Sequence, residues 1–188
     1  RGTVISTHPG FGTVTMCFAF SHDDAYLAAS SVAGDVALFD TNSGEKLWQV
    51  TLTAAIEPLI LVRSIVFSPD GTRLLATVSN GEVAVLDTPT GTTVHTFREH
   101  KDQEYRNPVQ AVRFSEDGKS VTSVSRDGAI LVWNVETGHE LQPVEQTARG
   151  TAELPSVTAI SPDHLSIATG HADGTLRVWD RREGKSQI

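Results

Sequence analysis

The stretch Ser123–Asn134 reads SVSRDGAILVWN, and its counterpart Thr169–Asp180 reads TGHADGTLRVWD. In both, a short strand-like segment leads to an Asp-Gly pair, and a second apolar segment then ends on Trp followed by Asn or Asp. Because Gly adopts the positive φ values that tight turns require, this order of residues is typical of a β-hairpin. The two stretches therefore predict short antiparallel strands and no helix.

The same register occurs four times along the chain of 188 residues. Each unit has a hydrophobic residue followed by Ser, at Phe20-Ser21, Phe67-Ser68, Phe114-Ser115 and Ile160-Ser161. The differences 67 − 20 and 114 − 67 are both 47, and 160 − 114 is 46. Turn glycines keep these steps, at Gly34, Gly81, Gly128 and Gly174 and again at Gly44, Gly91, Gly138 and Gly184. Each unit is therefore predicted to be four short antiparallel strands, which makes the chain an all-β repeat protein.

The endings Ile130-Leu-Val-Trp-Asn134 and Leu176-Arg-Val-Trp-Asp180 resemble those of the WD-repeat β-propeller family. In that family a repeat of about 40–45 residues forms one four-stranded blade. The resemblance implies a single propeller segment over residues 1–188. Its four blades are expected at 9–54, 55–100, 101–147 and 148–188, with residues 1–8 as the outer strand of a preceding or closing blade and the outer strand of the fourth blade truncated.

Four blades are fewer than WD-repeat propellers usually contain, so the ring is expected to be incomplete, and three arrangements remain open. The chain is a fragment of a larger propeller, or its first strand completes its own fourth blade, or two four-bladed chains close an eight-bladed ring. The initial Arg1 favours the fragment. The expected structural partners are therefore further blades or a second chain.

Composition and charge limit the classes of partner and site. A content of 39% hydrophobic and 20% charged residues is ordinary for a globular domain. The net charge of −8 argues against nucleic acid as a partner, and no apolar run approaches the roughly 20 residues that cross a membrane. The single Cys17 excludes an internal disulfide and favours an intracellular location, cytoplasmic or nuclear. The seven histidines lack metal-site spacing, so neither a metal nor a cofactor is expected.

The resemblance also implies a structural hydrogen-bond network of His, Ser or Thr, Asp and Trp in each blade. The third blade has all four residue types, at His100, Ser123, Asp127 and Trp133. The fourth has Thr169, Asp173 and Trp179 but no His before its first strand. The first two blades have mostly apolar residues at these positions, namely Ala29, Ala33 and Phe39, and Ala76, Asn80 and Leu86. We expect these two blades to be held together by burial and backbone pairing alone.

Two long polar segments, 99–108 and 142–155, join successive blades. The resemblance implies that such loops share a face of the propeller with the Asp-Gly turns, where partners bind. The candidate partner-binding residues combine an aromatic ring with both signs of charge: Lys101, Asp102, Glu104, Tyr105 and Arg106 in the first loop, and Arg126 beside the Asp-Gly turn. The alternative is that these loops are solvated insertions without a partner.

Three functions are weighed on these residues. The leading hypothesis is a non-catalytic scaffold that binds other proteins. The alternative is a substrate receptor on a cullin-4 ubiquitin ligase adaptor, because the ending Trp179-Asp180 followed by Arg182 resembles the docking box of such receptors, although Ser166 departs from it. The remote alternative is a propeller hydrolase with His100, Ser123 and Asp127 as a triad, which would require an exposed hydroxyl and a cleft.

Overall fold

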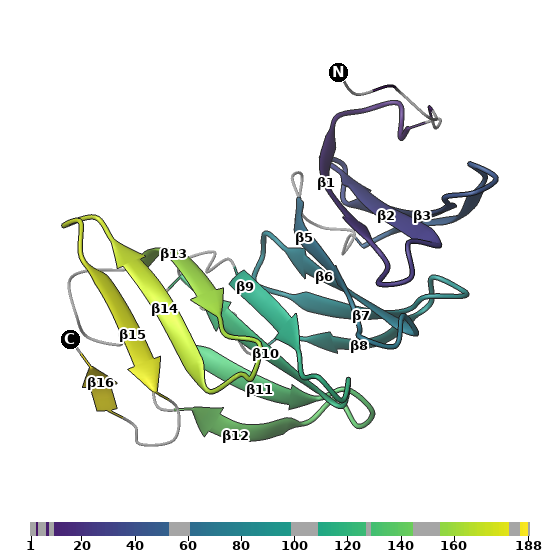
Figure 1. Cartoon of the computed structure of the whole chain (residues 1–188). Helices are drawn as coiled ribbons and strands as arrows, with labels where there is room; N and C mark the ends of the chain where they lie inside the picture. Colours follow the sequence, from purple (N-terminus) through teal and green to yellow (C-terminus); the bar gives the residue numbers. More distant parts are fainter. Residues whose placement is uncertain are drawn as a thin grey trace. The chain divides into compact units, whose positions relative to one another are not determined.

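The structure is a computed structural model, and it describes residues 3, 7, 10–52, 61–98, 109–126, 129–144, 155–180 and 185–187. These residues form sixteen β-strands in four sheets of four strands each (Figure 1). The predicted all-β class and the four strands of each repeat are confirmed. Residues 1, 2, 4–6, 8 and 9, to which we assign most of an outer strand, lie outside the described residues.

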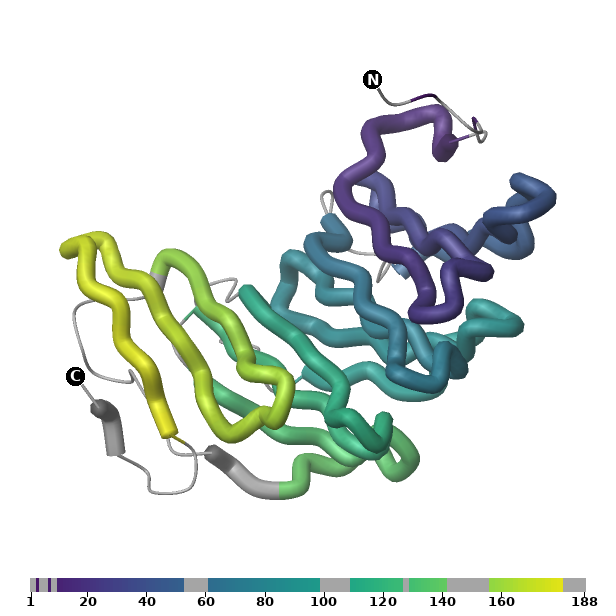
Figure 2. Tube along the Cα trace, in the orientation of Figure 1, coloured from purple at the N-terminus to yellow at the C-terminus, as the bar shows by residue number. Residues whose placement is uncertain are grey.

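Within each sheet the strands follow one another in chain order, which the tube in Figure 2 traces. The first sheet contains β1 (Thr15–Phe20), β2 (Tyr26–Ser31), β3 (Asp35–Asp40) and β4 (Lys46–Thr51). The second contains β5 (Val62–Phe67), β6 (Arg73–Val78), β7 (Val83–Asp87) and β8 (Thr93–Phe97). The third contains β9 (Val109–Phe114), β10 (Ser120–Ser125), β11 (Ile130–Asn134) and β12 (Glu140–Val144). The fourth contains β13 (Pro155–Ile160), β14 (Ser166–His171), β15 (Leu176–Asp180) and β16 (Lys185–Gln187).

One hydrogen-bonded turn explains why Ser recurs after the first strand of each sheet. Ser115 Oγ donates to Asp117 Oδ1 at 2.6 Å and accepts from the backbone N–H of Ser120 at 3.0 Å. The same two bonds occur at Ser21, Ser68 and Ser161. At Asp23, Asp70 and Asp117 the pKa of the carboxyl lies below its usual range, mainly because the carboxylate accepts this bond from the Ser hydroxyl. Each turn is thus specified by residues only a few positions apart.

In all four sheets, the residue that follows the Asp of this turn has a left-handed backbone. Its φ is 71° at Gly71 and 69° at Gly118, but 58° at Asp24 and 59° at His164. Gly adopts this conformation freely, whereas any side chain with a Cβ is strained there. His164 therefore requires interactions that compensate for the strain.

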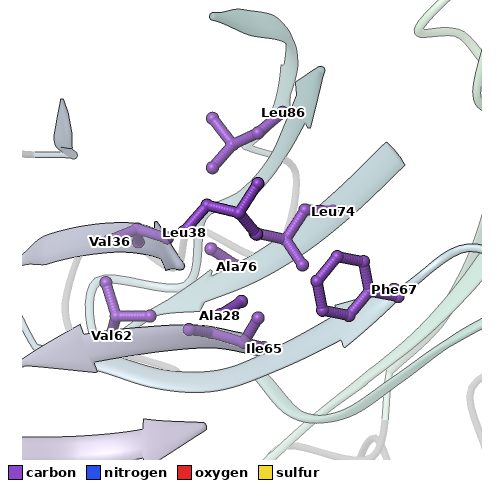
Figure 3. Packing of buried hydrophobic residues seen from close by; sticks show 9 residues of the cluster. All are labelled: Ala28, Val36, Leu38, Val62, Ile65, Phe67, Leu74, Ala76 and Leu86. Carbon is purple, nitrogen blue, oxygen red and sulfur yellow. The ribbon is translucent and has the colours of Figure 1, made fainter. Parts of the chain in front are cut away.

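The chain divides into two compact units, which we describe separately: Arg1–Val78 with Ala84–Val94, and Ser79–Val83 with His95–Ile188. In the first unit, one face of the first sheet packs on β5, β6 and β7. Figure 3 shows the nine buried residues of this core: Ala28, Val36, Leu38, Val62, Ile65, Phe67, Leu74, Ala76 and Leu86. Burial of these side chains is the main source of stability in this unit.

In the second unit, the third sheet packs on the fourth. Val124 and Ile130 from the third sheet contact Ile167 of β14, and Ala111, Ile160 and Trp179 pack against this cluster. Alternation along the strands explains the arrangement, because every second side chain points to the same face. The residues between them point to the other face of each sheet. Several polar side chains of these strands are also buried, and their hydrogen bonds form the candidate sites.

Candidate functional site

The hydrogen-bond network predicted for the third sheet is centred on Trp133 of β11. Its side chain is 1% exposed, and its Nε1 donates to Ser123 Oγ of β10 at 2.9 Å. Phe97 of β8 stacks on the indole, with ring centroids 4.6 Å apart and an interplanar angle of 7°. Ser123 is itself fully buried, so a substrate could not reach its hydroxyl. The roles of His100 and Asp127 stay predictions, because both lie outside the described residues.

The fourth sheet repeats the Trp bond and adds a histidine that sequence reasoning missed. Trp179 Nε1 donates to Thr169 Oγ1 at 3.0 Å, and Thr169 Oγ1 lies 3.0 Å from His171 Nε2. The family resemblance implies a histidine in the loop before the first strand, whereas His171 is two residues after Thr169 on β14. Asp173 bonds instead to the backbone N–H and hydroxyl of Thr175 and lies 3.9 Å from Arg177.

His164 joins the first turn of the fourth sheet to the third sheet. Its Nε2 lies 2.6 Å from the carbonyl oxygen of Phe114, and its Nδ1 lies 2.9 Å from Thr122 Oγ1. Because a carbonyl oxygen only accepts, Nε2 has the proton, and in a neutral imidazole Nδ1 accepts from the Thr122 hydroxyl. These two buried bonds offset the left-handed backbone of His164. Sequence reasoning placed a turn here and gave the imidazole no role.

An open hollow of about 570 Å³ lies at these first turns of the third and fourth sheets. We call it the acidic hollow, because Glu116, Asp117 and Asp163 line it together with His164. The carboxylates of Asp117 and Asp163 each accept a Ser hydroxyl, and the pKa of Asp117 lies below its usual range mainly because of that bond. The acidic hollow is therefore suited to a cationic group, such as a basic side chain of a partner.

Most residues predicted to bind a partner lie outside the described part of the chain, namely Lys101, Asp102, Glu104, Tyr105, Arg106 and Arg182. Arg126 is described and is exposed at the end of β10. Val109 pairs with Ser125, so the first residue of β9 and the last residue of β10, which Arg126 follows, lie at the same end of the third sheet. The predicted binding face itself stays a prediction.

In two sheets, an aromatic side chain of the fourth strand lies against the turn between the third and fourth strands of the next sheet. Trp48 Nε1 donates to the carbonyl oxygen of Thr88 at 2.8 Å, and a Cβ added at Gly91 would lie 2.7 Å from the indole. In the second unit, 47 residues later, His95 Nε2 lies 2.9 Å from the Glu136 carbonyl oxygen. Its ring covers a glycine in the same manner, at Gly138. The expectation that the first two blades rely on burial and backbone pairing alone is wrong, because the Trp48 indole binds across them.

Other candidates for chemistry give little support to catalysis. Cys17 Sγ lies 2.9 Å from Ser30 Oγ, and burial raises the pKa of the thiol, which disfavours the reactive thiolate. Among the described residues, no group of three or more His, Cys, Asp and Glu side chains could hold a metal ion. The described ranges also contain no helix of sufficient length and apolarity to cross a bilayer.

Comparison with known proteins supports the β-propeller fold, and the family model that matches is not the WD-repeat family that the sequence resembles. The family model described as "Outer membrane protein assembly factor BamB" matches residues 32–187. This is a family of β-propeller repeats, so the predicted fold class is confirmed, whereas the WD-repeat type stays a prediction. No curated protein matches the chain.

A solved structure of similar extent agrees with this fold. The crystal structure of the computationally designed Ika4 protein is similar to the chain with a TM-score of 0.70 and 20% sequence identity. The similarity covers 96% of this chain and 99% of that chain. At this identity the likeness concerns the fold alone, and it extends over nearly the whole of both chains.

Proposed function

Because the chain belongs to the β-propeller repeat family described as outer membrane protein assembly factor BamB, we propose that it is a non-catalytic scaffold that binds other proteins. The observation that carries the proposal is the burial of Ser123. Its hydroxyl accepts the Trp133 indole inside the third sheet, so this residue of the hypothetical triad serves the fold. A triad would need that hydroxyl in an open cleft.

We also propose that the repeats are of the WD type. The Trp133–Ser123 and Trp179–Thr169 bonds support this, because they join equivalent positions of successive sheets, with 179 − 133 and 169 − 123 both equal to 46. Repetition of a buried indole donor on a hydroxyl is what the WD resemblance implies.

The proposed binding surface is the end of the third sheet at which Arg126 is exposed, together with the loop 99–108 that precedes β9 in the sequence. Its predicted content of Tyr and Arg suits protein recognition, because these residues give large contact areas and directed hydrogen bonds. The acidic hollow lies at the opposite ends of β9 and β10, where it offers a second surface for a basic segment.

Site-specific photo-cross-linking tests the binding surface. A photoreactive phenylalanine analogue at Tyr105 should form adducts with a partner in cells, whereas the same analogue at Thr90, an exposed turn residue of the second sheet, should not. The combined change of Lys101, Tyr105 and Arg106 to Ala should abolish adducts formed from Arg126. Equal adducts from Tyr105 and Thr90, or none from either, would contradict the proposal.

The cullin-4 alternative depends on Arg182, which lies outside the described residues, and no contact among the described residues favours it. Binding to the purified adaptor that is lost in Arg182→Ala would support this alternative.

The cellular compartment of the protein can also be tested directly. The single Cys17 supports our proposal of an intracellular location, the family's name refers to outer membrane proteins, and fractionation of cells that contain the tagged chain separates the two.

A further inference from the structure

On the side away from the second sheet, the first sheet is covered over β2 and β3, where Phe11 and Leu27 pack on the buried Ala29, Ala37 and Phe39, but its strand β1 presents exposed apolar side chains. On β1, Cys17 and Ala19 pack against the core of the first unit. Because side chains alternate along a regular strand, Phe18 and Phe20 point to the opposite face. Phe18 is 70% exposed and Phe20 is 57% exposed. A continuous row of such side chains, which we call the Phe18 face, marks an interaction surface.

The repeat register indicates what kind of surface the Phe18 face binds. Phe18 and Phe20 correspond to Ile65 and Phe67 of β5, 47 residues later. Ile65 is 6% exposed and Phe67 is 4% exposed, because both pack in the core between the first sheet and β5. These positions are therefore buried wherever a preceding sheet covers them. The Phe18 face has the same chemistry, and among the described residues no sheet packs on it.

The fourth sheet presents the counterpart of that missing surface. The first sheet contacts the core of the first unit through Cys17, Val36 and Leu38. The corresponding positions, 140 residues later, are Val157, Leu176 and Val178. They are 67%, 74% and 44% exposed, and we call them the Leu176 face. The opposite side of the fourth sheet is the one that packs on the third, through Ile160, Ile167 and Trp179.

We propose that the Phe18 face of one chain binds the Leu176 face of a second copy of the chain. The occupant is a second copy because one chain has both members of the matched pair, each in the register of an existing sheet-to-sheet contact. Two such contacts related by a twofold axis would cover all four exposed faces. The resulting pair would contain eight sheets, within the range of about 4–8 blades that propellers have.

The mass of the 188-residue chain in solution tests the proposal. Size-exclusion chromatography with light scattering, over a hundredfold range of concentration, should give twice the 20.2 kDa of one chain. Phe18→Asp and Leu176→Asp should each weaken the pair at least tenfold, because each places a charge in an apolar contact. Leu141→Asp is the matched control, since Leu141 is 50% exposed on β12 and belongs to neither face. Phe18→Ser and Leu176→Ser repeat the test with uncharged side chains.

Mixing the two Asp variants distinguishes this contact from other pairings. In a mixed pair one contact has both substitutions and the other has none, so the mixture should recover pairs that neither variant forms alone. A mass of one chain at every concentration would overturn the proposal, and it is the result expected if the faces close on each other within one chain or await blades of a longer protein. Assemblies larger than two chains, or a pair that only one substitution weakens, would also overturn it.

Discussion

Replacement of Trp133 by Ala should be among the most destabilising substitutions in the second unit. The side chain is 1% exposed, stacks on Phe97 at 4.6 Å and donates a hydrogen bond to Ser123. Trp→Ala changes in cores cost about 3–5 kcal/mol. The stacked pair adds about 0.5–1.5 kcal/mol and the hydrogen bond about 1 kcal/mol to what the residue contributes. We therefore expect a loss near the top of the range, about 5 kcal/mol.

The hydrogen bond can be separated from the ring by a double-mutant cycle. Trp133→Phe keeps an aromatic ring against Phe97 but removes the indole donor, and Ser123→Ala removes the acceptor. We expect each single change to cost about 1–2 kcal/mol and the pair to show a coupling of about 1 kcal/mol. Urea-induced unfolding followed by circular dichroism measures these values.

Trp48→Phe is the control, because it removes a half-buried indole donor that bonds to Thr88, and it should show no coupling with Ser123→Ala. A loss below about 1 kcal/mol for Trp133→Ala would refute the reasoning, since a buried, stacked and hydrogen-bonded indole cannot be removed at that cost. Zero coupling in the cycle would refute the assigned bond while leaving the packing intact.

Three further predictions concern turns. Gly91→Ala should cost at least about 1 kcal/mol more than Gly71→Ala, because both positions have φ near +70° but only Gly91 faces the Trp48 ring; equal losses in urea titrations would exclude the contact. His164→Gly removes the strained backbone together with the bonds to Thr122 and Phe114, and it should still destabilise by about 1–3 kcal/mol; a gain in stability would mean that strain outweighs the bonds. The pKa of Asp70 lies below its usual range mainly because of the Ser68 hydroxyl, so its carboxylate favours folding above about pH 4 and loses that effect as the pH falls through the lowered pKa. Ser68→Ala should reduce the fall in stability as the pH drops below about 4, and an unchanged acid profile would count against the bond.

The parts of the fold that could be predicted from the sequence depend on short-range interactions. The Ser115–Asp117 bond joins residues two positions apart, and the next residue has the left-handed backbone that Gly118 provides. Such turns, repeated every 46 or 47 residues, define the strands between them, and alternation then defines their two faces. This local information was sufficient to predict four sheets of four strands each.

The interactions that escaped prediction join residues far apart in sequence. His164 binds Thr122 and Phe114, which are 42 and 50 residues away. From the sequence alone, His164 is an ordinary turn residue, because the repeat pattern predicts its backbone conformation but not the direction of its side chain. A histidine where two of the other repeats have Gly was the available signal, since a strained position is retained only when its side chain gains something elsewhere.

The exposed faces show the same limit from the opposite direction. Phe18 and Ile65 have equivalent places in the register, and a pattern read from sequence predicts burial for both. One is 70% exposed and the other 6%, because burial of a sheet face depends on a neighbouring sheet and not on the strand itself. A repeat therefore specifies which surfaces must be covered and leaves open what covers them. In this chain the exposed Phe18 and Leu176 faces have matching places in the register, so the pattern that predicts the strands is also the basis of the contact that we propose between copies.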